Sequence, residues 1–379
     1  MSVLRCLAYV ATLCLALVPA ARAIDTPARH AILLDVGTGT VLLAKDADEQ
    51  MPPASMSKLM TISMLFEALA EGRVKLDDTF EVSEKAWKMG GSKMFVEVGK
   101  QARIEDLIRG IVVQSGNDAC IVVAEGLGGT EEAFARKMTE RAHELGLTHS
   151  SFANASGWPH PDQHMSARDL SKLAIHLIED FPEYYKYFAE LEFTYAGIKQ
   201  GNRNPLLYKD IGADGLKTGH TEASGYGLVA SAVQDGRRLV LVVNGLESVN
   251  QRSRESARLL AWGFREFEAV KLFKAGETVA DADVWLGGET TVPLVPAEPV
   301  EVLLPRAGRK DMKVAVRYDG PVPAPIAKGT EIATLSISAP DMETKEVPLL
   351  AGADVERLGA VGRIFARLGH MVWGLAASQ

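Results

Sequence analysis

The chain has 379 residues, which is enough for two domains with sizeable hydrophobic cores. Apolar residues make up 47% and charged residues 24%, as in ordinary globular proteins, and the net charge of −8 argues against a general nucleic-acid role. No CxxC, HExxH or clustered His/Asp set occurs, so we expect no metal site and no cofactor.

The first 23 residues have the pattern of a secretory signal. Arg5 supplies a positive charge, Cys6–Val18 is an apolar run too short to span a bilayer comfortably, and residues 21–23 fit a small-x-small cleavage site. An uncleaved anchor is the alternative. Cleavage would remove two arginines and no acid, changing the net charge from −8 to −10, and would leave Cys120 as the only cysteine. We therefore expect an exported protein without an internal disulfide.

Residues 24–267 alternate strand-like and helix-like patterns, which predicts an α/β domain. We expect a hairpin, then three helices, then two adjacent buried strands. The segments are 30–35 with 41–44 for the hairpin, 56–70, 104–126 and 131–145 for the helices, and 228–232 with 239–244 for the strands.

Two regions of different character follow. Residues 268–350 contain short β-rich runs separated by Pro and Gly, at 300–304, 312–316 and 331–336, which predicts a small all-β domain. Residues 351–379 are expected to form an amphipathic helix, with apolar positions from Val355 to Leu375 on one face and Arg363 and Arg367 on the other. Such a helix either binds a membrane surface, which we favour, or packs on its own protein.

Ser55 and Lys58 open the first predicted long helix. A lysine three residues after a serine lies about one turn away, so its amine can reach the hydroxyl. Serine is a weak nucleophile until a base takes its proton, and a buried lysine with a lowered pKa can be that base. Alone the pair is weak evidence, because a capping serine beside a surface lysine gives the same pattern.

Two further polar elements occur downstream. Ser115-Gly-Asn117 lies between two apolar helical stretches, either as a surface break or as a loop aimed into a cleft. Lys217-Thr-Gly219 leads into an apolar strand-like run, and on an edge strand it would present a cation, a hydroxyl and bare backbone on one side. Each element alone is usually a turn, but all three motifs occur once each and in this order.

This ordered set is known from class A β-lactamases and penicillin-binding proteins. The sequence around the motifs closely resembles the serine D-alanyl-D-alanine carboxypeptidases of the low-molecular-mass penicillin-binding class, peptidase family S11. The resembling segments are PASMSKLMT at 53–61, SGNDAC at 115–120 and DGLKTGHT at 214–221. The resemblance implies a penicillin-recognising α/β (α+β) catalytic domain, with an antiparallel sheet flanked by helices and Ser55 between sheet and helical lobe. A small all-β domain and a C-terminal amphipathic helix would follow.

The resemblance also implies roles for individual residues. Ser55 would attack the carbonyl of the penultimate D-Ala, Lys58 would act as general base, and Ser115 would relay a proton toward the leaving amine. Asn117 would hold the substrate backbone and orient Lys58. The chain would thus remove the terminal D-alanine from peptidoglycan pentapeptide stems through an acyl-serine and be acylated by β-lactams.

The remaining implied residues bind substrate. Lys217 would support the site electrostatically, and Thr218 would contact the substrate carboxylate beside Gly219. The backbone N–H groups of Ser55 and His220 would form an oxyanion hole. Arg252 would pair with the terminal carboxylate, with Arg254 as a nearby competitor.

Three alternatives remain open from the sequence. A class A β-lactamase would need a Glu-x-x-Leu-Asn element, which is absent between Ser115 and Lys217. A D,D-endopeptidase would cut peptidoglycan cross-links with the same machinery, and an envelope scaffold would keep the fold without activity. For the favoured enzyme we expect a periplasmic location, peripherally attached to the outer face of the cytoplasmic membrane, and a role in cell-wall maturation and cell shape.

Overall fold

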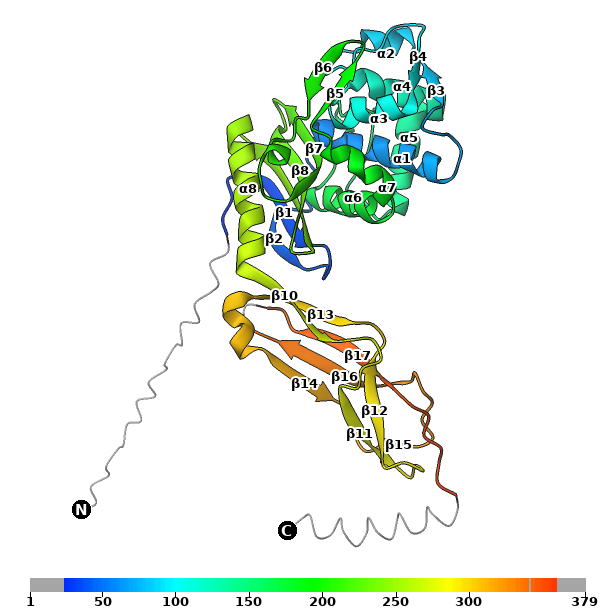
Figure 1. Ribbon diagram of the computed structural model, residues 1–379, viewed down its shortest axis with the longest axis vertical. Coiled ribbons are helices and arrows are strands. Elements are labelled where there is room, and N and C mark those ends of the chain that lie inside the picture. The colour runs from blue at the N-terminus through cyan, green and yellow to red at the C-terminus, as the bar shows by residue number, and fades with distance from the viewer. Residues whose placement is uncertain (1–23, 341, 360–379) are drawn as a thin grey trace, which may run out of the picture.

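The computed structural model describes residues 24–340 and 342–359 (Figure 1). The predicted signal at 1–23 and the segment 360–379 lie outside the described residues. Figure 1 shows a mixed α/β domain and, below it, a domain made almost entirely of strands. No helix in the described part of the chain is long and apolar enough to cross a bilayer.

The first domain is built on a five-stranded antiparallel sheet in the order β2-β1-β9-β8-β7. The middles of β8 and β9 are buried on both faces, which is why they read as continuous apolar runs rather than alternating ones. The predicted hairpin and the two adjacent strands are confirmed. The strands are β1 His30–Asp35, β2 Val41–Lys45, β7 Ala213–Thr221, β8 Gly225–Gln234 and β9 Arg237–Leu246.

Helices cover both faces of this sheet. The helical lobe packs on one face around a large apolar core, and α8 (Val249–Glu266) packs on the other face around a smaller one. The main lobe elements are η1 Ala54–Ser57, α1 Lys58–Ala70, α3 Ile104–Val112, α4 Asn117–Gly128, α5 Glu131–Glu144 and α6 Ala167–Glu179. Shorter elements are α2 Glu84–Lys88, α7 Pro182–Tyr185, η2 Lys186–Ala189, η3 Pro205–Tyr208 and the ribbons β3 Thr79–Glu81 with β4 Gln101–Arg103 and β5 Glu192–Tyr195 with β6 Ile198–Gly201.

The single helix predicted over 104–126 is wrong. Two helices, α3 and α4, replace it, separated by residues 113–116. Ser115 has a φ of 61°, in the left-handed region, which a right-handed helix cannot contain. The polar motif therefore forms a tight, buried loop at the start of α4 rather than a break on the surface, which is the second of the two placements left open by the sequence.

The second domain contains a six-stranded sheet, ordered β14-β16-β17-β12-β11-β15, and a two-stranded sheet of β10 and β13. Its apolar core is separate from the two cores of the first domain. The three predicted β-rich runs correspond to β13, β14 and β16. The strands are β10 Phe267–Phe273, β11 Ala280–Trp285, β12 Thr291–Pro296, β13 Val300–Pro305, β14 Lys313–Arg317, β15 Val322–Pro323, β16 Glu331–Ser338 and β17 Lys345–Ala351; η4 spans Arg306–Asp311.

The prediction that the C-terminal helix begins at 351 is also wrong. Ala351 ends β17, and Val355 is buried in the core of the β domain. The backbone of Val355 exchanges two hydrogen bonds with that of Ile326, and the N–H of Leu358 donates to the carbonyl of Leu286. Val355 and Leu358 fit the three- and four-residue spacing of an amphipathic helix. Their apolar side chains belong to the β domain instead. The rest of the predicted helix lies outside the described residues.

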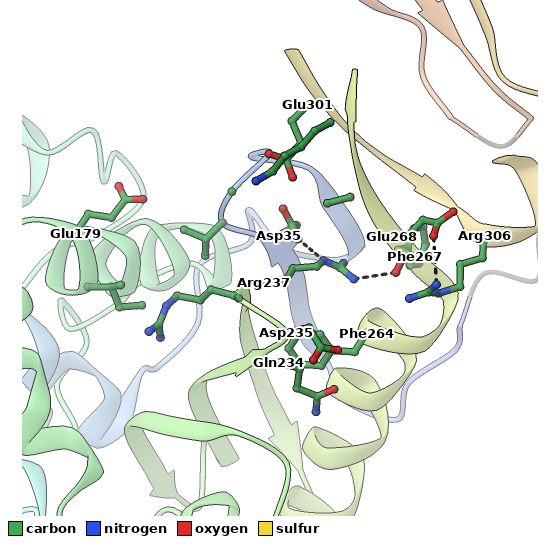
Figure 2. Close-up of a pocket in the computed structure, with 17 residues that line it drawn as sticks. Asp35, Glu179, Gln234, Asp235, Arg237, Phe264, Phe267, Glu268, Glu301 and Arg306 are labelled. Carbon is green, nitrogen blue, oxygen red and sulfur yellow. Dashed lines mark hydrogen bonds and ion pairs between the residues drawn. The ribbon is translucent and has the colours of Figure 1, made fainter. Parts of the chain in front are cut away.

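Arg237 joins the two domains at the point where α8 runs directly into β10 (Figure 2). Its Nε lies 2.6 Å from Oδ2 of the buried Asp35, and its Nη1 donates to the carbonyls of Gly263 (3.1 Å) and Phe267 (2.9 Å). These contacts line a cavity of about 640 Å³ between the domains. One side chain thus ties the sheet of the first domain to the first residue of the second.

We expect Arg237→Ala to destabilise the protein by roughly 3–5 kcal/mol, because Asp35 would be left buried without its cation. Urea unfolding followed by tryptophan fluorescence measures this effect. Arg265→Ala is the matched control, because the Arg265–Glu266 pair is exposed and such pairs contribute less than about 1 kcal/mol. Equal stability of the two variants would show that the buried pair does not hold the junction.

Candidate active site

Lys58 is the centre of a polar cluster at the start of α1. Its Nζ lies 2.8 Å from Ser55 Oγ and 2.7 Å from Asn117 Oδ1, and it also contacts the carbonyl oxygen of Ser156. Asn117 presents its oxygen because its Nδ2 donates to the carbonyl of Gly90, at 2.9 Å. Within the described residues, the Lys58 amine makes no hydrogen bond to a carboxylate.

A neutral amine can make these three contacts, as can a charged amine with its three N–H donors. A neutral lysine has two N–H donors and one lone pair, and the cluster offers two pure acceptors, Asn117 Oδ1 and Ser156 O, and one hydroxyl, Ser55 Oγ. With both donors directed to the carbonyl groups, the lone pair faces the Ser55 hydroxyl. Burial first, and then the positive charge of Arg203, lower the pKa of Lys58 to about 8.

The loop before α4 holds Asn117 in place. The Asn117 N–H donates to the carbonyl of Ser92 at 2.8 Å, and the carboxylate of Asp118 accepts hydrogen bonds from the backbone N–H groups of residues 94–96. Ser115 is 2% exposed and occupies the left-handed turn just before the helix. Asp118 thus orders the loop that carries Gly90, a role not assigned from the sequence.

Strand β7 brings the third motif against the same turn. Lys217, Thr218 and Gly219 are buried, whereas His220 is exposed. A Cβ atom at Gly219 would lie 2.8 Å from the carbonyl oxygen of Pro53, so only glycine lets the strand pass this close to the Ser55 turn. Burial, and then the charges of Lys58 and Arg203, hold the pKa of Lys217 well below its usual range.

Gly157 packs against the opposite side of the Ser55 turn. It has a φ of 77°, and a Cβ there would lie only 2.0 Å from the carbonyl oxygen of Ala54. Gly157 also follows Ser156, whose carbonyl binds Lys58. Any side chain at this position would therefore displace either the turn that carries the nucleophile or the acceptor that orients the amine.

We expect Gly157→Ala to slow penicillin acylation by at least about tenfold and to destabilise the fold by roughly 1–3 kcal/mol. Stopped-flow acylation and thermal unfolding measure the two effects. Gly146→Ala is the control, because Gly146 has a φ of 73° but open space around its Cβ position. Wild-type acylation by the Gly157 variant would mean that the turn tolerates displacement.

Arg252 and Arg203 supply positive charge near the site. Arg252 on α8 is 6% exposed, its Nη1 lies 3.5 Å from the carbonyl of Gly227, and its Nε has no partner in the described residues. Burial lowers its pKa to about 10. Arg254, the competitor from the sequence, is exposed. A buried guanidinium without an acidic partner is suited to an incoming anion.

Arg203 was missed by the sequence analysis. Its Nη1 lies 2.5 Å from Ser92 Oγ, and its charge lowers the pKa values of Lys58, Lys217 and Arg252. It lies in the loop between β6 and η3. No sequence motif includes it, so the sequence alone gave no indication of a role. Cys120, in contrast, is a buried core residue, and burial raises the pKa of its thiol to about 12.

The comparisons with known proteins agree with this geometry. Residues 18–248 match the family model described as D-alanyl-D-alanine carboxypeptidase. The chain belongs to this family. Residues 267–357 match the model of the penicillin-binding protein 5 C-terminal domain. The predicted family, the two-domain fold and the class of serine carboxypeptidase are thereby confirmed, and the matches do not favour the endopeptidase or β-lactamase alternatives.

Individual family members match most of the chain. D-alanyl-D-alanine carboxypeptidase DacC of Escherichia coli is 39% identical over 346 residues, covering 89% of this chain and 86% of that protein. Penicillin-binding protein 5 of Haemophilus influenzae superposes with a TM-score of 0.79 at 35% identity, over 88% of this chain and all of that one. Penicillin-binding protein D2 of Listeria monocytogenes, in an ampicillin-bound form, superposes with a TM-score of 0.59 at 28% identity. The match covers 64% of this chain and 99% of that one.

Proposed function

We propose that this carboxypeptidase removes the terminal D-alanine from peptidoglycan pentapeptide stems by way of an ester on Ser55. The observation that supports this most strongly is the Lys58 amine, which is buried, has a lowered pKa, and lies 2.8 Å from the Ser55 hydroxyl. A neutral amine at hydrogen-bond distance from a serine is the arrangement that nucleophilic attack requires.

In the first step, the Ser55 proton passes to Lys58 Nζ while Oγ forms a bond to the carbonyl carbon of the penultimate D-alanine. The backbone N–H groups of Ser55 and His220 stabilise the oxyanion. The C–N bond then breaks, and the proton reaches the leaving amine through Ser115. Free D-alanine departs and an acyl-serine ester remains. Water, deprotonated by the same amine, cleaves this ester and restores the Ser55 hydroxyl.

The terminal carboxylate of the substrate supplies the selectivity in this proposal. Thr218 on β7 offers a hydroxyl, and Lys217 on β7 and Arg252 on α8 offer positive charge. Asn117 would bind the substrate amide through Nδ2 while keeping Lys58 oriented. Such a carboxylate pocket explains why a C-terminal residue would be removed rather than an internal bond cut.

β-Lactams would acylate the same serine. The Listeria relative is described in ampicillin- and cefotaxime-bound forms, and we propose the same susceptibility here. Attack of Ser55 on the lactam carbonyl breaks a C–N bond whose nitrogen stays tethered to the acyl group. The leaving amine cannot diffuse away, so the ester persists.

Purified residues 24–379 test the proposal with two substrates, a soluble pentapeptide and a cross-linked peptidoglycan dimer. We expect one equivalent of D-alanine from the pentapeptide, measured by mass spectrometry, and an intact dimer. Faster cleavage of the dimer would instead assign an endopeptidase. Continuous hydrolysis of penicillin without a stable adduct would assign a β-lactamase.

We also propose that the protein works outside the cytoplasmic membrane, bound to its outer face, in cell-wall maturation and the maintenance of cell shape. The signal-like residues 1–23 support export. Support for attachment comes from segment 360–379, which keeps most of the apolar positions up to Leu375 together with Arg363 and Arg367.

Deleting residues 360–379 should release the protein from vesicles that contain anionic lipid, while turnover of soluble pentapeptide stays within about twofold. The cut follows Gly359 because residues 351–358 belong to the β domain. Each arginine adds about 1 kcal/mol near an anionic surface, so high salt should weaken binding of the full chain without abolishing it. Sedimentation of both forms measures this, and equal sedimentation of the two would exclude this segment as the anchor.

A further inference from the structure

A small recess opens beside the Ser55 turn. It has a volume of about 300 Å³ and is walled by residues 52–54, residues 157–161 with Gln163, and Thr221 with Ala223. Its walls are four prolines, two alanines, a glycine and Trp158, together with His160, Gln163 and Thr221, and no lysine, arginine or carboxylate lines it. His160 is the one titratable group in its wall. The recess is therefore apolar, in contrast to the polar cluster around Lys58.

The walls of the recess are chain neighbours of active-site residues. Ala54 directly precedes Ser55, Gly157 directly follows Ser156, and Thr221 directly follows His220. Each wall thus comes from a segment that also supplies a group to the acylation site. The recess therefore lies beside the turn at which a substrate would be held by Ser55.

The direction of β7 indicates which half of the substrate would enter, if the proposed function holds. The terminal carboxylate lies at Lys217 and Thr218, and the reacting carbonyl lies at the N–H of His220. The acyl half then continues past His220, toward Thr221 and Ala223, which line the recess. The leaving D-alanine points the other way.

Trp158 is the largest residue in the wall of the recess. Its backbone N–H and carbonyl both bind the side chain of Asn154, at 3.0 and 2.9 Å, and the edge of its indole lies against Gly90 and Gly91. The residue is nevertheless 47% exposed. An indole that contacts the protein along one edge and is left half uncovered offers a stacking surface.

We propose that this recess binds an apolar, preferably aromatic, side chain on the acyl half of the substrate or β-lactam, with Trp158 as the specificity-determining residue. The established reaction needs no such side chain, so the recess acts on selectivity among substrates rather than on bond cleavage.

Two penicillins that differ only in a phenyl ring test this directly, benzylpenicillin and 6-acetamidopenicillanic acid. The readout is the ratio of their second-order acylation rates, because damage to Ser55 or Lys58 would lower both rates alike. Burial of a phenyl ring against an aromatic wall supports a ratio of about ten in the wild type. Trp158→Ala should bring the ratio close to one, and Trp158→Phe should keep most of it.

Trp87→Ala is the matched control, because Trp87 is 45% exposed on α2 but does not line the recess. It should retain the wild-type ratio. A wild-type ratio near one, or an unchanged ratio in Trp158→Ala, would overturn the inference while leaving the carboxypeptidase proposal intact. Failure of both penicillins to acylate the wild type would instead overturn the proposed function itself.

Discussion

Replacing Ser55 with alanine should reduce D-alanine release by roughly 10⁴-fold or more and should abolish covalent labelling by penicillin. Both reactions pass through one ester on the Ser55 oxygen, and no other hydroxyl in the described residues bonds to the Lys58 amine. Intact-mass spectrometry after incubation with benzylpenicillin should show one adduct on the wild type and none on the variant.

Ser63→Ala is a suitable control for this experiment. Ser63 lies on the same helix, and its buried hydroxyl has no partner in the described residues, so its loss should leave acylation unchanged. An adduct that persists on the Ser55 variant would place the nucleophile elsewhere.

Replacing Lys58 with alanine should slow acylation by roughly 10²–10⁴-fold while the protein stays folded, because general-base catalysis contributes about this much. The wild-type rate should depend on pH through the same amine. Its pKa is about 8, so below pH 8 the amine is charged and cannot accept the Ser55 proton. The acylation rate should therefore rise with pH through a single ionisation near 8 and then level off.

Stopped-flow acylation between about pH 6 and about pH 10 measures this profile, because this range extends about two units to either side of the Lys58 pKa of about 8. Lys172→Ala serves as the control, because Lys172 is an exposed lysine on α6 and should change neither rate nor profile. Near-normal acylation by the Lys58 variant, or a flat profile in the wild type, would remove Lys58 as the base.

Local patterns were enough to predict several parts of the site. The spacing of Ser55 and Lys58 corresponds to about one helical turn, and the structure places their reacting atoms in contact. The strand character of the apolar run after Lys217 was equally readable, and this run is β8. These features depend on neighbouring residues alone.

Features that depend on long-range contacts were not predictable from the sequence. The carbonyl of Ser156 reaches Lys58 across 98 positions, and a backbone acceptor leaves no mark in side-chain patterns. Arg203 reaches the site from a loop without a motif. Val355 fits a helical face as well as a β-domain core, so only the tertiary contacts decide between the two.

Trapping the covalent intermediate tests the central claim most directly, namely that turnover passes through an ester on Ser55. An ester analogue of the substrate, with D-lactate in place of the terminal D-alanine, should acylate faster than it deacylates. After an acid quench and proteolysis, mass spectrometry should find the acyl group on the peptide that contains Ser55. Acylation of any other residue, or turnover with no trapped ester, would contradict the account.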